Sequence, residues 1–343
     1  MKRMFALLAV VGPSLGCEFP GAPFEIAAVV QVGSTYELWF GRSDGTAHGQ
    51  GTAGIAVNNA PFFSRRGKYL AYFAQDGESF TTHKHATAID AEPEEVPDLS
   101  GQILAISDDG AEYVVGRGTA ASYDLVITNG SDEAIVLPAV SFPRATQLFD
   151  GGVATIDGNN ALHLGRTDSN PVVLTTTQAT SFGIDEKNGL IYWVEVDNAQ
   201  FDSDGGVLMS AKLDGSDKKE VPGATDATGA GAGNTGAPAA VLVAVDGAVV
   251  VARSEGTPGT GRARVLRDGT WLTTGQAMAN VVSADGRYLV NGGTPEGGTP
   301  SVGVLPLEAP NEDGSPMEVK SFALGTGDGY VGAPVAGLAA IAP

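Results

Sequence analysis

Cysteine is nearly absent from this sequence, since Cys17 is the only one in 343 residues. The chain therefore cannot form an internal disulfide, and a lone thiol in an exported protein either stays free or is consumed by a modification. Long apolar runs are also lacking. No stretch after the first twenty residues has about 18 consecutive apolar residues, so the sequence predicts no further membrane-spanning helix.

Positive charge is scarce as well. Lys and Arg number 20 against 40 Asp and Glu, which gives a formal net charge of −20. A surface this negative repels phosphate backbones, so we expect no nucleic acid partner. Only 7% of the residues are aromatic, which argues against a groove that stacks sugars. Trp39, Trp193 and Trp271 either line a shared surface or pack in the core.

The motifs of common catalytic sites are missing too. The sequence has no G-x-S-x-G turn for a serine nucleophile and no G-x-x-x-x-G-K loop for a phosphate. We therefore predict a protein without enzymatic activity and without a cofactor. A hydrolase or lyase whose carboxylates come from distant segments is the alternative, because such pairs leave no local signature.

The first residues carry an export pattern. Lys2 and Arg3 precede the apolar run Met4–Val11, and Ser14-Leu15-Gly16-Cys17 follows. Such an order is typical of a secretory signal, and it resembles the lipobox of bacterial lipoproteins, in which the cysteine is lipidated. The resemblance implies a signal peptide over 1–16 and a lipidated tether over 17–23. It also implies a place in the bacterial cell envelope, periplasmic or on the outer surface, with membrane contact through the lipid anchor only.

The rest of the chain repeats a short pattern. Helical periodicity is nearly absent, and short apolar runs alternate with Gly, Asp, Asn and Pro, as in strands joined by tight turns. The clearest copies are Phe63-Ser64-Arg65-Arg66-Gly67-Lys68-Tyr69, Ile106-Ser107-Asp108-Asp109-Gly110 and Val282-Ser283-Ala284-Asp285-Gly286. Glycine suits such a hairpin turn because its backbone adopts a positive φ without strain.

These turns recur at a regular interval. The turn glycines lie 38 to 43 residues apart, except for one interval of 58, and they are Gly67, Gly110, Gly151, Gly189, Gly247 and Gly286. The long interval contains the Gly- and Ala-rich stretch 223–237, which we interpret as an inserted surface loop. A second turn, such as Asn129-Gly130, follows the first by about twenty residues, although the second repeat has only Asp90–Pro93 as a candidate. Each repeat is therefore predicted to hold two hairpins and four strands.

Four-stranded units of about forty residues are the blades of a β-propeller. We predict an all-β domain of seven blades over residues 24–343, with six or eight blades as alternatives. The first repeat has only three strands, over Phe24–Val32, Tyr36–Arg42 and Thr52–Val57, while the apolar run Val335–Ala342 has no partner of its own. Pairing this run with the first repeat closes the ring and removes two exposed sheet edges.

Two parts of the sequence resemble known propeller repeats. The segments 63–72, 106–114 and 282–289 resemble the repeat of TolB-like and WD-repeat-like bacterial propellers. The segment 183–221, with Tyr192-Trp193-Val194-Glu195 and a Leu-Asp-Gly turn, is similar to the YWTD-type repeat of the LDL-receptor family. The first resemblance implies a protein-binding module. We therefore expect a monomeric, non-enzymatic propeller that binds an envelope protein or peptide on one face of its ring.

Two groups of side chains could bind a metal ion. His83 and His85 lie two positions apart in a predicted strand, on one face, either as an exposed pair or as two ligands. Asp197, Asp202 and Asp204 share one loop with two glycines, and it is either a solvated hairpin loop or a calcium site. Calcium binding would make the protein a calcium-stabilised structural or adhesive surface protein.

Overall fold

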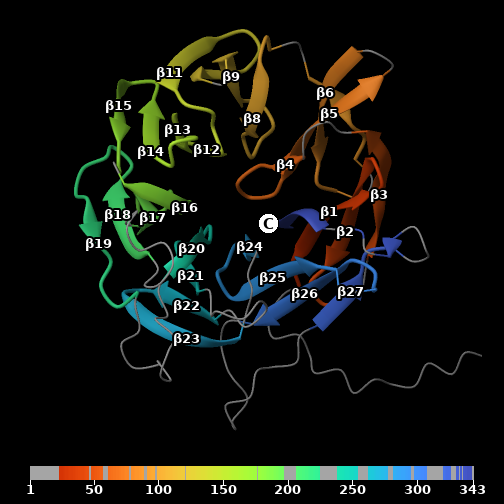
Figure 1. Ribbon diagram of the computed structural model, residues 1–343. Coiled ribbons are helices and arrows are strands. Elements are labelled where there is room, and N and C mark those ends of the chain that lie inside the picture. The colour runs from red at the N-terminus through yellow and green to blue at the C-terminus, as the bar shows by residue number, and fades with distance from the viewer. Residues whose placement is uncertain are drawn as a thin grey trace, which may run out of the picture.

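The computed structural model describes residues 23–45, 48–56, 61–76, 79–88, 91–96, 99–119, 121–175, 177–196, 206–224, 238–253, 262–276, 281–294, 297–306, 320–325, 330–331, 333 and 335–341. Within this part of the chain, seven four-stranded antiparallel sheets stand radially around one axis (Figure 1). The predicted all-β fold with seven propeller blades is confirmed. No helix among these residues is long and apolar enough to cross a membrane.

The strands of each blade run in order from the axis outward. Blade 1 contains β28 (Val335–Ile341), β1 (Glu25–Val32), β2 (Thr35–Arg42) and β3 (His48–Ala56). Blade 2 contains β4 (Phe62–Phe63), β5 (Tyr69–Asp76), β6 (Ser79–Ala86) and β7 (Glu94–Glu95). Blade 3 contains β8 (Gln102–Ile106), β9 (Tyr113–Thr119), β10 (Ser122–Thr128) and β11 (Glu133–Val140). Blade 4 contains β12 (Ala145–Phe149), β13 (Gly152–Ile156), β14 (Leu162–Arg166) and β15 (Ser169–Val173).

The remaining blades have the same order. Blade 5 contains β16 (Gln178–Asp185), β17 (Leu190–Val196), β18 (Val207–Lys212) and β19 (Lys219–Glu220). Blade 6 contains β20 (Pro238–Val243), β21 (Val249–Arg253), β22 (Arg262–Arg267) and β23 (Thr270–Gln276). Blade 7 contains β24 (Val281–Val282), β25 (Tyr288–Gly293), β26 (Ser301–Pro306) and β27 (Lys320–Ala323).

Blade 1 joins the two ends of the ring. Its innermost strand, β28, comes from the end of the domain and pairs antiparallel with β1 from Glu25–Ile341 to Val29–Gly337, with a bulge after Val29. This pairing provides hydrogen-bond partners for backbone groups of β1 and β28 that would otherwise lie on two open strand edges. The predicted closure by the C-terminal strand agrees with this arrangement.

The core is divided among the interfaces between blades. Seven clusters of buried apolar side chains occur in the described residues, one between each pair of neighbouring blades. Trp193 is fully buried between blades 4 and 5, whereas Trp39 and Trp271 are half-buried and pack at two other interfaces. The three tryptophans therefore lie at three separate interfaces rather than on one shared surface.

The Ser-x-x-Gly repeat has a local physical cause. The Ser107 hydroxyl donates to the carboxylate of Asp109 and accepts the backbone N–H groups of Ala111 and Glu112. Ser283 makes the equivalent bonds in blade 7. The glycine that ends the turn has a positive φ, which is 70° at both Gly67 and Gly110, as the sequence predicts. Serine and glycine thus help to fix the turn between the first two strands in blades 2, 3 and 7.

The ring has two faces that differ in their turns. We call the Arg66 face the end that carries the turns between first and second strands, which are 64–68, 107–112, 150–151, 186–189, 244–247 and 283–287. We call the Asp157 face the opposite end, which carries turns between second and third strands such as 33–34 and 157–161. The candidate functional site lies on the Arg66 face.

Candidate functional site

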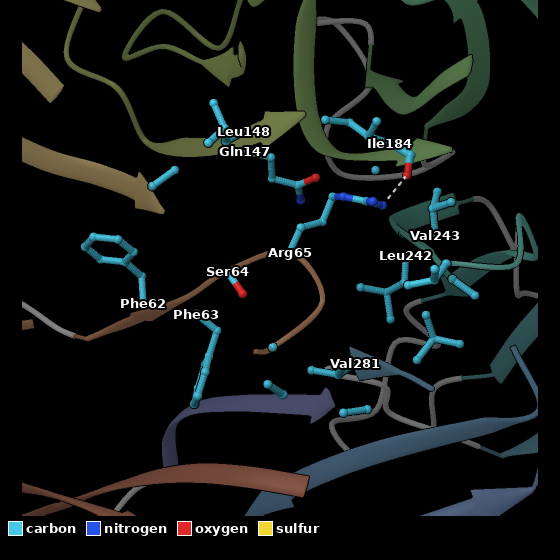
Figure 2. A pocket seen from close by; sticks show the side chains of 18 of the residues that line it. Phe62, Phe63, Ser64, Arg65, Gln147, Leu148, Ile184, Leu242, Val243 and Val281 are labelled. Carbon is cyan, nitrogen blue, oxygen red and sulfur yellow. Dashed lines mark hydrogen bonds between the residues drawn. The ribbon is translucent and has the colours of Figure 1, made fainter. Parts of the chain in front are cut away.

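The inner strands enclose a channel that is lined mostly by residues with apolar side chains. A cavity of about 400 Å³ lies along the axis. Its walls include Phe62, Phe63, Leu148, Leu242 and Val281, which Figure 2 shows from close by. Apolar walls follow from the inner strands, because each is buried between two neighbouring blades and the axis.

Arg65 lies across this channel at the Arg66 face. Its side chain leaves the β4–β5 turn of blade 2 and reaches blade 5 on the other side of the ring, where Nη1 donates to the backbone oxygen of Ile184 at 3.3 Å (Figure 2). Its Nη2 forms an ion pair with the carboxylate of Glu186. The Arg65 side chain is only 10% exposed. A buried cation that bridges two opposite blades therefore lies at the mouth of the channel.

Arg66, the next residue, connects blade 2 to blade 3. Its backbone N–H donates to Asp108 Oδ1 at 2.7 Å, and its Nε lies 3.5 Å from Asp108 Oδ2. Its Nη2 also lies 3.6 Å from Glu186 Oε2, while Glu186 Oε1 accepts the N–H of Asp150 from blade 4 at 3.1 Å. One polar network therefore holds the turns of blades 2, 3, 4 and 5 together.

Two further cavities flank Arg66. The smaller has about 330 Å³ and is lined by five carboxylates, Asp108, Asp109, Glu112, Asp150 and Glu186, against the basic Arg66 and Lys68. The larger has about 710 Å³ and is lined by Glu25, Asp246 and Asp285 together with the apolar Phe24, Val245 and Ile341. Hydrogen bonds from the Ser107 hydroxyl and the Ala111 N–H lower the pKa of Asp109, which keeps that carboxylate charged. The mouth therefore presents negative charge beside apolar surface.

The predicted histidine pair lies in β6, as expected for a strand. His83 stacks on Tyr72 with ring centroids 5.5 Å apart, and His85 is buried with its ring 6.2 Å from that of Phe40. Among the described residues no group of three or more His, Cys, Asp or Glu side chains has the arrangement of a metal site. His85 therefore packs against blade 1 and His83 against Tyr72 of its own blade, and neither imidazole is a freely exposed surface group.

Several predicted positions lie outside the described residues. They are Cys17, the carboxylates Asp197, Asp202 and Asp204, and most of the 223–237 loop. The lipidation and calcium predictions at these positions remain predictions.

Sequence reasoning missed the Arg65–Arg66 pair, although the repeat contains a signal for it. Where blade 2 has Arg65 and Arg66, blade 3 has two aspartates and blade 7 has alanine and aspartate. The turn still forms with arginine at both positions, because Ser64 Oγ accepts the N–H of Tyr69 and Gly67 has a positive φ. A change from acidic to basic residues at such positions is a departure from the repeat that points to a special role.

Comparisons with known proteins agree with the architecture. No protein-family model and no curated protein matches the chain. An oligogalacturonate lyase in complex with manganese matches with a TM-score of 0.56 and 14% identity, over 80% of this chain and 83% of that one. The fold is shared. TolB from Acinetobacter baumannii matches with a TM-score of 0.45 and 13% identity, over 74% of this chain, and the chain spans 64% of TolB.

A structure of a nidogen/laminin complex also matches, with a TM-score of 0.43 and 12% identity over 87% of this chain and 93% of that one. At identities this low, a common fold says nothing about activity.

Proposed function

We propose that this protein is a lipoprotein of the bacterial envelope, anchored through Cys17, whose propeller binds a protein partner without catalysing a reaction. The observation that carries the binding proposal is the pair of cavities on either side of Arg66. The larger cavity combines apolar walls with a few charged groups, which is the usual form of a binding site, and the smaller one adds a cluster of carboxylates. A rigid ring presents such a site without rearranging, which favours recognition.

The charges at the mouth favour a basic partner. Eight carboxylates line the two cavities, against Arg66 and Lys68, and they are Glu25, Asp108, Asp109, Glu112, Asp150, Glu186, Asp246 and Asp285. Complementary charge steers a partner and suppresses wrong ones, while the apolar walls of the larger cavity give an aliphatic or aromatic side chain a place to pack. The site therefore suits a polypeptide segment with lysine or arginine next to an apolar residue.

Charge reversal at the mouth tests this proposal. Glu25 and Glu112 are exposed, and each lines one of the two cavities. The double variant Glu25→Lys/Glu112→Lys should fold normally and lose the partner that the wild-type protein captures from an envelope extract. The matched control is Glu92→Lys/Glu220→Lys, which makes the same charge change at exposed positions on the outer part of blades 2 and 5. Equal capture by both double variants would contradict binding at the mouth.

The anchor has its own test. The variant Cys17→Ala should fold normally, carry no lipid and fractionate with soluble proteins, whereas the wild-type protein should carry the lipid and fractionate with membranes. Membrane fractionation of Cys17→Ala would rule out lipidation as the means of anchoring.

A further inference from the structure

The chain enters the fold beside the mouth. Pro23 and Phe24 line the larger cavity together with Arg66 of blade 2. Phe24 is held firmly, because its N–H donates to Ser43 Oγ at 3.0 Å and its oxygen accepts the N–H of Ser43 at 2.9 Å. Its ring also lies 5.5 Å from that of Tyr288 in blade 7. The point from which a tether extends is therefore fixed close to the axis, on the Arg66 face.

The length from Cys17 to this point is short. Pro23 follows Cys17 by six positions in the sequence, and six residues span at most about 20 Å even when fully extended. The other face lies at the far end of β1, whose eight residues span about 26 Å. A lipid on Cys17 can therefore hold the Arg66 face close to a membrane, and the Asp157 face lies farther away.

We infer that the anchored ring stands with its Arg66 face toward the membrane, so that the mouth admits an extended polypeptide segment and excludes a folded domain. This inference rests on the proposed lipid anchor, and it deepens the proposed function by naming the form of the partner. An extended segment needs a gap of about 10 Å. A folded domain of 100 residues has a radius of gyration of about 13 Å, so its full width exceeds the gap of about 20 Å that the tether allows.

Two single-cysteine variants can measure the orientation. Ala111 and Ala121 are exposed and flank β9, Ala111 on the Arg66 face and Ala121 on the Asp157 face. Because Cys17 is the only native cysteine and lipidation consumes it, a dye on Ala111→Cys or Ala121→Cys labels one known position. The full lipidated protein is placed in phosphatidylcholine vesicles that carry a nitroxide on the headgroup. We expect quenching of the dye at position 111 to be about twofold or more stronger than at position 121.

The outcomes separate the two proposals. If mass spectrometry finds no lipid on the protein, the anchor fails and the orientation fails with it. If the lipid is present but the dye at position 121 is quenched as strongly as that at position 111, or more strongly, the orientation alone is wrong.

A second measurement tests the size limit. The unlabelled Ala111→Cys protein reacts either with a small maleimide or with a folded protein of about 15 kDa that carries one maleimide. Anchoring should slow the folded reagent by about tenfold relative to the same variant with Cys17→Ala, while leaving the small reagent unaffected. Equal rates of the folded reagent with and without the anchor would overturn the exclusion of folded domains.

Discussion

Replacing Arg65 with methionine should destabilise the ring more than the same change at its neighbour. Methionine keeps the length of the aliphatic stem, so the change removes the charge and the hydrogen bonds while preserving most of the packing. What is lost is the bond to the Ile184 oxygen at 3.3 Å and the ion pair with Glu186. Both interactions connect blade 2 to blade 5. The ion pair between Arg66 and Glu186, which is longer at 3.6 Å, joins the same two blades.

The size of the stability loss depends on how many partners Glu186 keeps when Arg65 is replaced. Removing one member of a fully buried ion pair costs about 3–5 kcal/mol. Glu186 is 26% exposed, and it retains Arg66 at 3.6 Å and the N–H of Asp150 at 3.1 Å. We therefore expect a smaller loss, about 2 kcal/mol in the free energy of unfolding, because water and these two groups compensate part of the charge. For a domain of this size that corresponds to a fall in Tm of roughly 3 °C.

Calorimetry of three variants checks this reasoning. Arg66→Met is the matched control, since its side chain is 38% exposed and its ion pairs should contribute at most about 1 kcal/mol. Arg65→Met/Glu186→Gln should recover part of the loss, because the double variant leaves no unpaired carboxylate. If Arg65→Met and Arg66→Met lowered Tm by the same amount, the bridge across the channel would contribute nothing beyond a surface pair.

Two further predictions concern the turns and the blade interfaces. Gly67→Ala should lower the free energy of unfolding by about 2–4 kcal/mol, because φ is 70° there and a Cβ would come within 2.8 Å of the closing strand β28. Gly33→Ala is the control, because φ is 63° but the space around it is open, and it should cost only about 1 kcal/mol. Urea denaturation measures both. Burial raises the pKa of Glu195, but hydrogen bonds from Thr177, Trp193 and Lys218 outweigh burial and leave that pKa lowered. The contribution of the Glu195 carboxylate to stability is therefore present above the unfolded-state pKa and is lost as pH falls through the folded-state pKa. Glu195→Gln should therefore lose less stability than the wild type between neutral pH and pH of about 4, and an equal acid dependence of Tm would contradict this assignment.

Features set by local chemistry could be predicted from the sequence. The turn at Gly110 needs a residue that tolerates a positive φ and a nearby serine that accepts backbone hydrogen bonds. The glycine and the serine lie within four residues of each other, so the repeat pattern shows both directly. The count of seven blades followed from the spacing of such turns. Ring closure could also be predicted, because an incomplete first repeat and an unpaired strand can satisfy their edges only by pairing with each other.

The site could not be predicted in the same way, because its contacts join distant segments. Arg65 and Glu186 are 121 residues apart in the sequence. They meet because the ring places blades 2 and 5 across the channel from each other, and the long side chain of Arg65 spans that channel. The sequence offers no register between blades that are not neighbours. The histidine pair shows the same limit, since the strand was predicted correctly but not the burial of His85 against Phe40 of blade 1.

A ring of similar blades has no preferred place for a ligand until some blades differ from the others. Two differences coincide in this protein, because blade 2 carries Arg66 in place of an acidic turn residue and blade 1 receives the incoming chain at Phe24. Both residues line the same cavity, so a ligand in that cavity touches the root of the proposed tether as well as the binding site. Phe24→Ala would disturb the two together, through its packing on Tyr288. Val245 lines the same cavity from blade 6 rather than from blade 1, where the proposed tether begins, so Val245→Ala is the substitution that tests binding alone.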